Sequence, residues 1–345
     1  MTPFWIFDFR SWIGSSERAK VFCFTLCALL FALRVSAQVQ QPKKIPRIGY
    51  LTLSSSSPSS PKEAFRDGLR QLGYIEGQSI HVDYRYAEGN LDRLPNLAAE
   101  LVRLKVDVIV AAGGIQAVQP AKNATSTIPI VMTGTSDPVA TGLIASFARP
   151  GGNITGLTLG GAELYGKRLE LLKETVPRIS RMVFFLDKTS PTITLSLASN
   201  EMQTSARALG LQIQSVEVQS ANDFADAFQA AVKGRAQALT VAPNPVFTNN
   251  RKQILEFAAK NRLPGIYPWR EYVEDGGLMS YASDLSDRYR RAATYVDKIL
   301  KGAKPAELPV EQPKKFEFVI NLKAAKQIGL TISPNILAGA DKVIK

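Results

Sequence analysis

The stretch IPRIGYLTLSSSSPSSPKEAFRDGLRQLG, residues 45–73, has the pattern of one strand followed by one helix. Residues 48–53 form an apolar run of strand length, and a serine-rich loop follows them. Ser60, Pro61 and Glu63 offer an N-cap, a first-turn proline and a capping-box acid for an amphipathic helix. A strand that leads through a loop into such a helix is the repeating unit of a parallel α/β sheet.

The same alternation continues along the chain and predicts two lobes. In the first lobe we expect further strands at residues 80–84, 106–112 and 128–132 and a helix over 138–148. A turn over residues 149–153 and a hinge at Gly160 and Gly161 lead into a second series. Its strands are expected at residues 182–186, 213–218, 239–242, 265–267 and 278–281, and its helices at 192–209, 224–232 and 254–259. A helix over 285–300 should return to the first lobe, before a last strand at 316–320 and a helix at 322–328.

The predicted fold class is therefore α/β, with two doubly wound parallel-sheet lobes joined by a hinge. The N-terminal lobe would comprise residues 38–158 with 282–312, and the C-terminal lobe residues 159–281 with 313–345. The lobe to which the last of these segments belongs stays open.

The first 37 residues have the pattern of a cleaved signal peptide. Basic residues precede an uncharged run over 21–33, and Val35, Ser36 and Ala37 supply small residues at the spacing of a cleavage site. The run is shorter than the roughly 20 residues that a membrane-spanning helix needs, so cleavage is favoured over a retained anchor. We therefore expect a soluble periplasmic protein.

Composition narrows the function classes further. Both cysteines, Cys23 and Cys27, lie in the signal segment, so the mature chain would form no disulfide, thiolate metal site or cysteine nucleophile. The formal net charge is +12, and +10 once residues 1–37, with four basic and two acidic residues, are removed. The basic residues are scattered rather than clustered, which is typical of a solvated surface and not of a nucleic-acid partner.

The sequence contains no motif for phosphate binding, dinucleotide binding, serine-hydrolase catalysis or zinc-protease catalysis. The one histidine, His81, alternates with Ile80 and Val82 and should lie on the less buried face of a strand. We expect no enzyme, no catalytic residue, no metal site and no cofactor.

Six phrases occur in order along nearly the whole mature chain. They are RIGYL (47–51), FRDGLRQLGYIEGQ (65–78), TSTIPIVM (125–132), SDPVATGLIASFARPGGNITGLT (136–158), GGLMSYASD (276–284) and KFEFVINLKAAKQIGLTI (315–332). Together they resemble the ABC-transporter substrate-binding family that includes tryptophan- and tyrosine-uptake binding proteins. The resemblance implies a type 1 periplasmic binding fold that closes by hinge motion around a ligand. It also implies delivery of a small organic solute, such as an amino acid or related carboxylate, to a permease in the inner membrane, by a monomer.

Two alternatives stay open beside this function. A ligand-sensing module would pass its closed form to a membrane receptor, and the neighbouring genes would distinguish it from an importer. A hydrolase on the same fold is disfavoured by the missing motifs. In this family an asparagine often follows the first strand of the second lobe, whereas this chain has Asp187 and Lys188, so the identity of the solute stays open.

Candidate ligand residues follow from the rule that open α/β sheets bind ligands beyond the carboxyl ends of their strands. They are Ser55, Ser56, Gly113, Gly114, Thr135 and Asp137 in the first lobe and Ser190, Asn244, Trp269 and Asp284 in the second. Three of these positions have a second interpretation. The Gly113–Gly114 pair allows a carboxylate to approach the backbone or forms only a tight turn, and Asp137 binds a ligand ammonium or only caps a helix. Trp269 holds a flat ligand against Tyr267 or only packs in the core.

Overall fold

The computed structural model describes residues 44–54, 61–161 and 163–345, and residues 45–345 form one compact unit. The predicted signal peptide lies outside these residues, as do Ser55, Ser56 and the expected cap Ser60. Within the described ranges, no helix combines the length and the apolar character that crossing a lipid bilayer requires.

A five-stranded parallel sheet forms in the first part of the described chain. Its strands are β1 (Arg47–Thr52), β2 (His81–Tyr86), β3 (Val108–Ala112), β4 (Ile130–Thr135) and β5 (Ile154–Thr158). They lie in the order β2-β1-β3-β4-β5. All residues of β3 and β4 are buried, as expected for parallel strands covered by helices on both faces.

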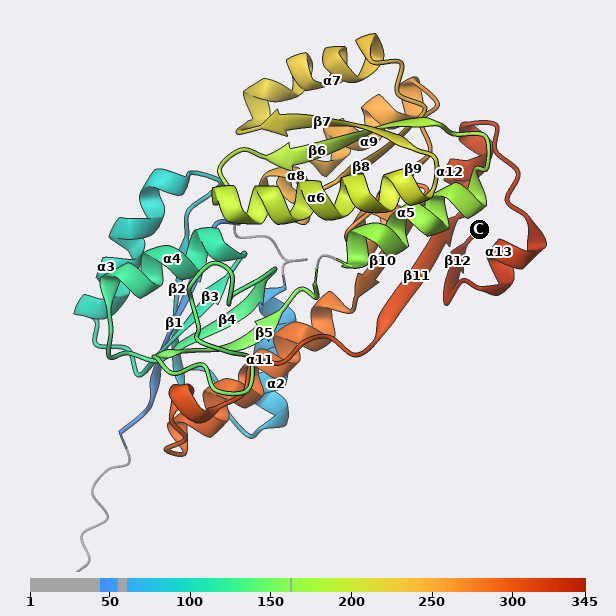
Figure 1. Cartoon of the computed structure of the whole chain (residues 1–345). Coiled ribbons are helices and arrows are strands. Elements are labelled where there is room, and N and C mark those ends of the chain that lie inside the picture. The colour runs from blue at the N-terminus through green and yellow to red at the C-terminus, as the bar shows by residue number, and fades with distance from the viewer. Residues whose placement is uncertain (1–43, 55–60, 162) are drawn as a thin grey trace, which may run out of the picture. The chain divides into compact units, whose positions relative to one another are not determined.

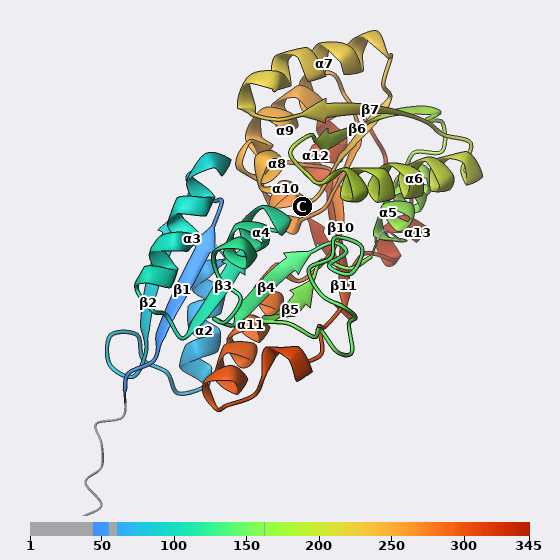
Figure 2. The same cartoon turned by 60° about the vertical axis from the view of Figure 1, so that its left-hand side comes forward.

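Helices cover both faces of this sheet (Figures 1 and 2). α3 (Leu94–Arg103) and α4 (Ile115–Ala124) share one apolar core with the sheet, and α2 (Lys62–Gln71) and α11 (Leu285–Leu300) share the other. α11 places Tyr289 and Ala292 in one core with Ile48 and Val110, although about 180 to 240 residues separate them along the chain. The predicted return of this helix to the first sheet is therefore confirmed.

A seven-stranded sheet forms from the later residues that the structure describes. Its strands are β6 (Arg181–Asp187), β7 (Gln212–Val218), β8 (Ala238–Val241), β9 (Gly265–Tyr267), β10 (Met279–Ser283), β11 (Phe316–Asn321) and β12 (Lys342–Ile344), in the order β12-β11-β10-β9-β8-β6-β7. Its longer helices are α5 (Glu163–Thr175), α6 (Thr192–Ala208), α7 (Phe224–Lys233) and α9 (Arg251–Lys260). The short ones are α8 (Pro245–Asn249), α10 (Arg270–Glu274), α12 (Leu322–Gln327) and α13 (Pro334–Ala338). α6 and α7 lie on opposite sides of β7 (Figure 1), so this sheet is also covered on both faces. The expected α/β fold with two doubly wound sheets is confirmed.

One strand pairing differs from the expected parallel sheets. β11 runs antiparallel to β10, with Ser283 opposite Phe316 and Met279 opposite Ile320. The chain reaches β11 from α11, which packs on the other sheet, and so enters beside the last residue of β10 instead of beside its first. Because α11 lies against the other sheet, the chain does not cross over this sheet between β10 and β11, and no parallel pairing is required.

The helix predicted over residues 138–148 is wrong, because this segment forms turns. The N–H groups of Leu143 and Ile144 both donate to the carbonyl of Pro138, and Gly142 has φ +67°. A left-handed residue interrupts a right-handed helix, and the buried Leu143 and Ile144 gain their packing without one. The apolar residues of this segment are therefore spaced so that they are buried from a series of turns, and their spacing does not reflect a helix.

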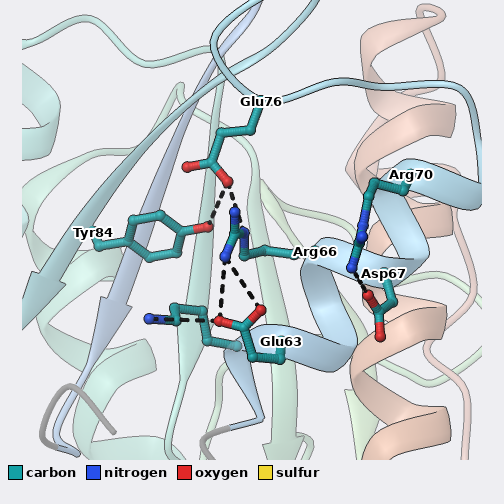
Figure 3. Close-up of polar contacts among 7 residues, drawn as sticks. Glu63, Arg66, Asp67, Arg70, Glu76 and Tyr84 are labelled. Atoms are coloured by element: carbon teal, nitrogen blue, oxygen red, sulfur yellow. Dashed lines mark hydrogen bonds and ion pairs between the residues drawn. The ribbon is translucent and has the colours of Figure 1, made fainter. Parts of the chain in front are cut away.

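The start of α2 also differs from the prediction. Its N-cap is Pro61, which makes no side-chain cap, so the helix begins one residue later than the sequence predicts, and the expected capping box involves Ser60, which lies outside the described residues. Figure 3 shows the Glu63 carboxylate directed at Arg66, whose Nη1 lies 3.2 Å from Oε2. The Nε of Arg66 donates to Glu76 at 2.8 Å, and the Tyr84 hydroxyl donates to the same carboxylate at 3.3 Å (Figure 3). Charged side chains thus connect the first turns of α2 with Glu76, in the turn before β2, and with Tyr84 of β2 itself.

Candidate ligand-binding site

The turns at the carboxyl ends of both sheets line three adjoining pockets. Each of the three has Leu159 and Pro243 in its wall, and they enclose about 500, 690 and 550 Å³, including space open to solvent. We name them after the charged residues that line them: the Asp187 pocket, the Arg168 pocket and the Arg288 pocket. Together they form the inter-sheet cavity, at the edge where the strands of doubly wound sheets bind ligands.

Asp187 ends β6 and is almost completely buried, with 1% of its surface exposed. Its carboxylate accepts hydrogen bonds from the Thr189 backbone N–H at 2.9 Å, the Thr189 hydroxyl at 2.7 Å and the Ser190 hydroxyl at 3.0 Å. The side-chain amide of Asn244 donates to it as well. Among the described residues it forms no ion pair, so neutral donors alone hold this buried charge.

Gln116 joins this network from the other sheet. It lies in the first turn of α4, and its Nε2 donates to Asp187 at 2.9 Å and to the Ser190 hydroxyl at 3.4 Å. Asn244 completes the arrangement, because its Oδ1 caps α8 by accepting from the Val246 N–H at 2.8 Å. The network therefore connects the turns after β3, β6 and β8.

Two buried arginines line the other pockets. Arg168 of α5 is 3% exposed, and its Nε donates to the carbonyl of Tyr281 at 2.9 Å. Burial lowers the pKa of its guanidinium to about 10. Arg288 of α11 is 5% exposed, and its guanidinium lies over the Trp269 ring, 5.0 Å from the centroid. Burial lowers the pKa of Arg288 too.

Neither arginine has a carboxylate within ion-pair distance in the part of the chain that the structure describes. The Arg288 Nη1 donates to the Ser283 hydroxyl at 3.3 Å, whereas its Nε finds no partner there. Arginine is seldom this deeply buried unless it is paired. The inter-sheet cavity is thus suited to a solute that carries negative charge.

Buried hydroxyl groups add further hydrogen-bonding capacity. The Oγ1 atoms of Thr133, Thr135 and Thr194 have no partner among the described residues, and all three residues line the inter-sheet cavity. Buried polar groups in native proteins are nearly always satisfied, so these positions favour a polar occupant.

Most of the sequence-predicted residues meet at this cavity. Gly113, Gly114, Thr135, Asp137, Ser190, Asn244 and Trp269 all line one or more of the three pockets. Asp284 does not: it is exposed, caps α11 by accepting from the Asp287 N–H at 3.0 Å, and lines two neighbouring pockets. Ser55 and Ser56 lie outside the described residues.

Asp137 shows that a capping role and a pocket position are compatible. Its Oδ1 accepts from the N–H groups of Val139 and Ala140 at 3.1 and 2.9 Å, which caps a turn instead of the expected helix. The same side chain lines the Arg168 pocket. Whether it also binds a ligand ammonium stays a prediction.

Of the two interpretations of Tyr267 and Trp269, the structure favours core packing for Tyr267. Tyr267 is 1% exposed and stacks on Tyr272 in the core, with ring centroids 4.8 Å apart. β9 ends at Tyr267, so the two-residue alternation of a strand does not extend to Trp269. Trp269 lines the Arg168 pocket, the Arg288 pocket and one of the two neighbouring pockets that Asp284 lines. The Arg288 guanidinium lies over its ring.

Sequence reasoning missed Arg168, Arg288 and Gln116. A single arginine in a helix usually lies on the solvent face, but Arg288 lies one helical turn before the buried Ala292. Arg168 likewise lies one turn after the buried Leu164. In both helices an arginine lies at a position whose helical spacing predicts an apolar residue. This pattern in the sequence could have identified Arg168 and Arg288 as buried.

Comparisons with known proteins identify the family of the chain. Residues 52–344 match the family of ABC transporter substrate-binding proteins, which is nearly the whole described chain. The chain belongs to the ABC transporter substrate-binding protein family. The family resemblance expected from the six phrases is therefore confirmed, and this protein is the solute-binding component of an ABC transporter.

Individual relatives are similar over most of their length. A tyrosine-binding protein of Clostridioides difficile is 25% identical over 289 residues, covering 84% of this chain and 82% of the relative. A structure from Streptococcus pneumonia in complex with L-Trp is 25% identical, with a TM-score of 0.80 over 87% of this chain and 99% of the other. A conserved domain protein from Vibrio cholerae is 27% identical, with a TM-score of 0.80 over 87% of this chain and 100% of its own.

Proposed function

We propose that this protein captures an amino acid or a related small organic acid in the inter-sheet cavity and delivers it to an ABC permease in the inner membrane. Two relatives are described as binding tyrosine and L-Trp, both of which carry a carboxylate. The observation that carries the proposal is the pair of buried arginines, Arg168 and Arg288, which line the cavity without an ion-pair partner.

The family match favours transport over the alternative, a ligand-sensing module for a membrane receptor. Binding proceeds without covalent chemistry in this proposal, because the residues around the cavity serve as hydrogen-bond donors and charge partners. The protein acts as a monomer.

Capture involves hinge motion between two lobes, residues 38–158 with 282–312 and residues 159–281 with 313–345. The chain passes from one sheet to the other after β5, after β10 and before β11. The chain connects the two sheets through three short segments, and one of them contains Gly160 and Gly161. These segments support a hinge, because a change in a few of their backbone torsions would move one lobe relative to the other.

Export by a signal peptide cleaved after Ala37 places the protein in the periplasm. The basic residues, the short apolar run and the small residues before Gln38 support this step.

The solute is contacted directly by the candidate residues that line the cavity, and Arg168 and Arg288 supply positive charge. These candidate residues are Gly113, Gly114, Thr135, Asp137, Ser190, Asn244 and Trp269.

Native mass spectrometry of the protein purified from its own periplasm tests the function. We expect a chain that begins at Gln38 and carries a small organic acid, which is released when the protein unfolds. A mature chain that retains residues 1–37, or one that carries no solute from any growth medium in which the transporter is expressed, would contradict the proposal.

A further inference from the structure

We infer that the Arg288 pocket is the subsite that binds the carboxylate group of the solute. The inference rests on the proposed function and deepens it, because it assigns the acid group to one of three pockets. The Gly113–Gly114 pair, which the sequence offered as a place for a carboxylate, lines this pocket, but its one charged residue, Arg288, was not among the sequence candidates.

Charge sets this pocket apart. Arg288 is its one charged lining residue among those that the structure describes. The acids that act on the Arg288 guanidinium through space are Glu271 and Asp284, and neither lies within 4.0 Å of it. Asp284 is exposed and lies 3.9 Å from Arg290 instead. A solute carboxylate would therefore supply the counter-charge that the pocket lacks.

Hydrogen-bond donors converge on the same pocket. A guanidinium presents a planar fork that matches the two oxygens of a carboxylate, and the Arg288 guanidinium lies over the Trp269 ring, 5.0 Å from its centroid. The unpartnered hydroxyl of Thr133 lines the pocket as well. Gly113 and Gly114, at φ +117° and +79°, lead into α4, whose first N–H groups have no acceptor within the helix.

The Arg168 pocket lacks this one-sided charge. Asp137 lines it together with Arg168, so groups of both signs face the same space. The Nε of Arg168 is also satisfied by the Tyr281 carbonyl. The Arg168 pocket is therefore better suited to a polar or ammonium group of the solute. The carboxylate of the solute is then assigned to the Arg288 pocket.

A purely structural role is the competing explanation for Arg288, because its bond to Ser283 ties α11 to the end of β10. Loss of a structural tie would weaken the binding of an acid and of its amide by the same factor. Loss of a carboxylate partner would weaken the acid alone. The ratio of the two affinities therefore separates the roles.

The experiment uses the full chain expressed with its leader and purified from the periplasm. Thermal shift against the common L-amino acids and benzoate selects the acids that bind, and calorimetry then compares each with its amide. For the wild type we expect the amide to bind at least about 30-fold more weakly than the acid. In Arg288→Gln the acid should weaken by about the same factor, so that the acid-to-amide ratio approaches one.

Arg290→Gln is the matched control, because it removes the same charge from a half-buried position of the same helix that does not line the Arg288 pocket. It should leave both affinities within about twofold of wild type. If Arg288→Gln lowers the melting temperature too far for titration, Thr133→Val provides a second variant. It should weaken the acid about threefold to tenfold and leave the amide unchanged.

Three results would overturn the inference. They are equal binding of acid and amide by the wild type, equal weakening of both in Arg288→Gln, and failure of every acid to bind. The last result would still leave the importer function intact if the periplasmic protein carried an uncharged solute. A protein that carries no solute at all would count against the proposed function itself.

Discussion

At the residue scale, buried charge distinguishes the cavity from an ordinary gap between two sheets. Asp187 is surrounded by neutral donors, and Arg168 and Arg288 have no carboxylate within ion-pair distance among the described residues. Because an unpaired buried cation destabilises a protein, such residues are retained where a ligand compensates for them. The two buried arginines therefore indicate that the solute carries negative charge.

Replacement of Asp137 by Asn separates its two roles. Asn keeps the oxygen that accepts from Val139 and Ala140, so the melting temperature of the free protein should stay nearly unchanged. If the carboxylate binds a ligand ammonium, the affinity for an amino acid should fall by about 30-fold or more, measured by calorimetry. Asp137→Ala is the control for the cap and should lose about 0.5–2 kcal/mol of stability. An affinity within about threefold of wild type in Asp137→Asn would leave the residue as a cap.

Trp269 offers a spectroscopic test of its place in the cavity. The other two tryptophans, Trp5 and Trp12, lie in the predicted signal peptide, so the fluorescence of the mature chain reports Trp269 alone. We expect a binding acid that is not itself tryptophan to change the emission, and Trp269→Ala to weaken binding in a folded protein. Unchanged emission at saturation, together with wild-type affinity of Trp269→Ala, would assign the residue to packing.

At the element scale, strands were predictable and the segments between them less so. The strands expected at 48–53, 182–186 and 265–267 correspond to β1, β6 and β9 within a residue or two, because continuous apolar runs leave few alternatives. The segment 138–148 has helical spacing but is held by turns, since Gly142 and a shared Pro138 carbonyl decide its path. Local pattern carries no information on such tertiary preferences.

The candidate site shows the same division. Residues at strand ends, such as Asn244 and Ser190, were predictable because topology alone brings them to one edge. Arg288 comes from a helix that starts about 100 residues after Ser190 and packs on the other sheet, so no local rule links it to the cavity. Asp284 was placed by its strand end, but its side chain is used for capping outside the three pockets.

The hydrogen bonds from Gln116 to Asp187 and Ser190 connect α4 to the turn after β6, and we expect them to stabilise the ligand-bound form. Gln116→Ala should weaken solute binding about tenfold, mainly by faster dissociation in stopped-flow measurements, because a hydrogen bond to a charged group is lost. Gln119→Ala is the matched control, since the Gln119 side chain, among the residues that the structure describes, bonds only to Asn123 of the same helix. Equal dissociation rates in the two variants would rule out this role of the network.

At the scale of the whole molecule, two sheets with their carboxyl ends at a common cavity and three crossings between them indicate capture by closure. Solution scattering should show a smaller radius of gyration when a confirmed ligand is added to ligand-free protein. An unchanged radius at saturation would argue for a rigid receptor.

Binding of an organic acid between the two sheets is the central step of the proposed function. A crystal structure of the protein purified from its own periplasm, with its co-purified solute, tests that step most directly. We predict an acid in the inter-sheet cavity, in contact with residues of both sheets and with its carboxylate at hydrogen-bond distance from Arg288. A solute without an acid group, or one bound away from Leu159 and Pro243, would contradict the account.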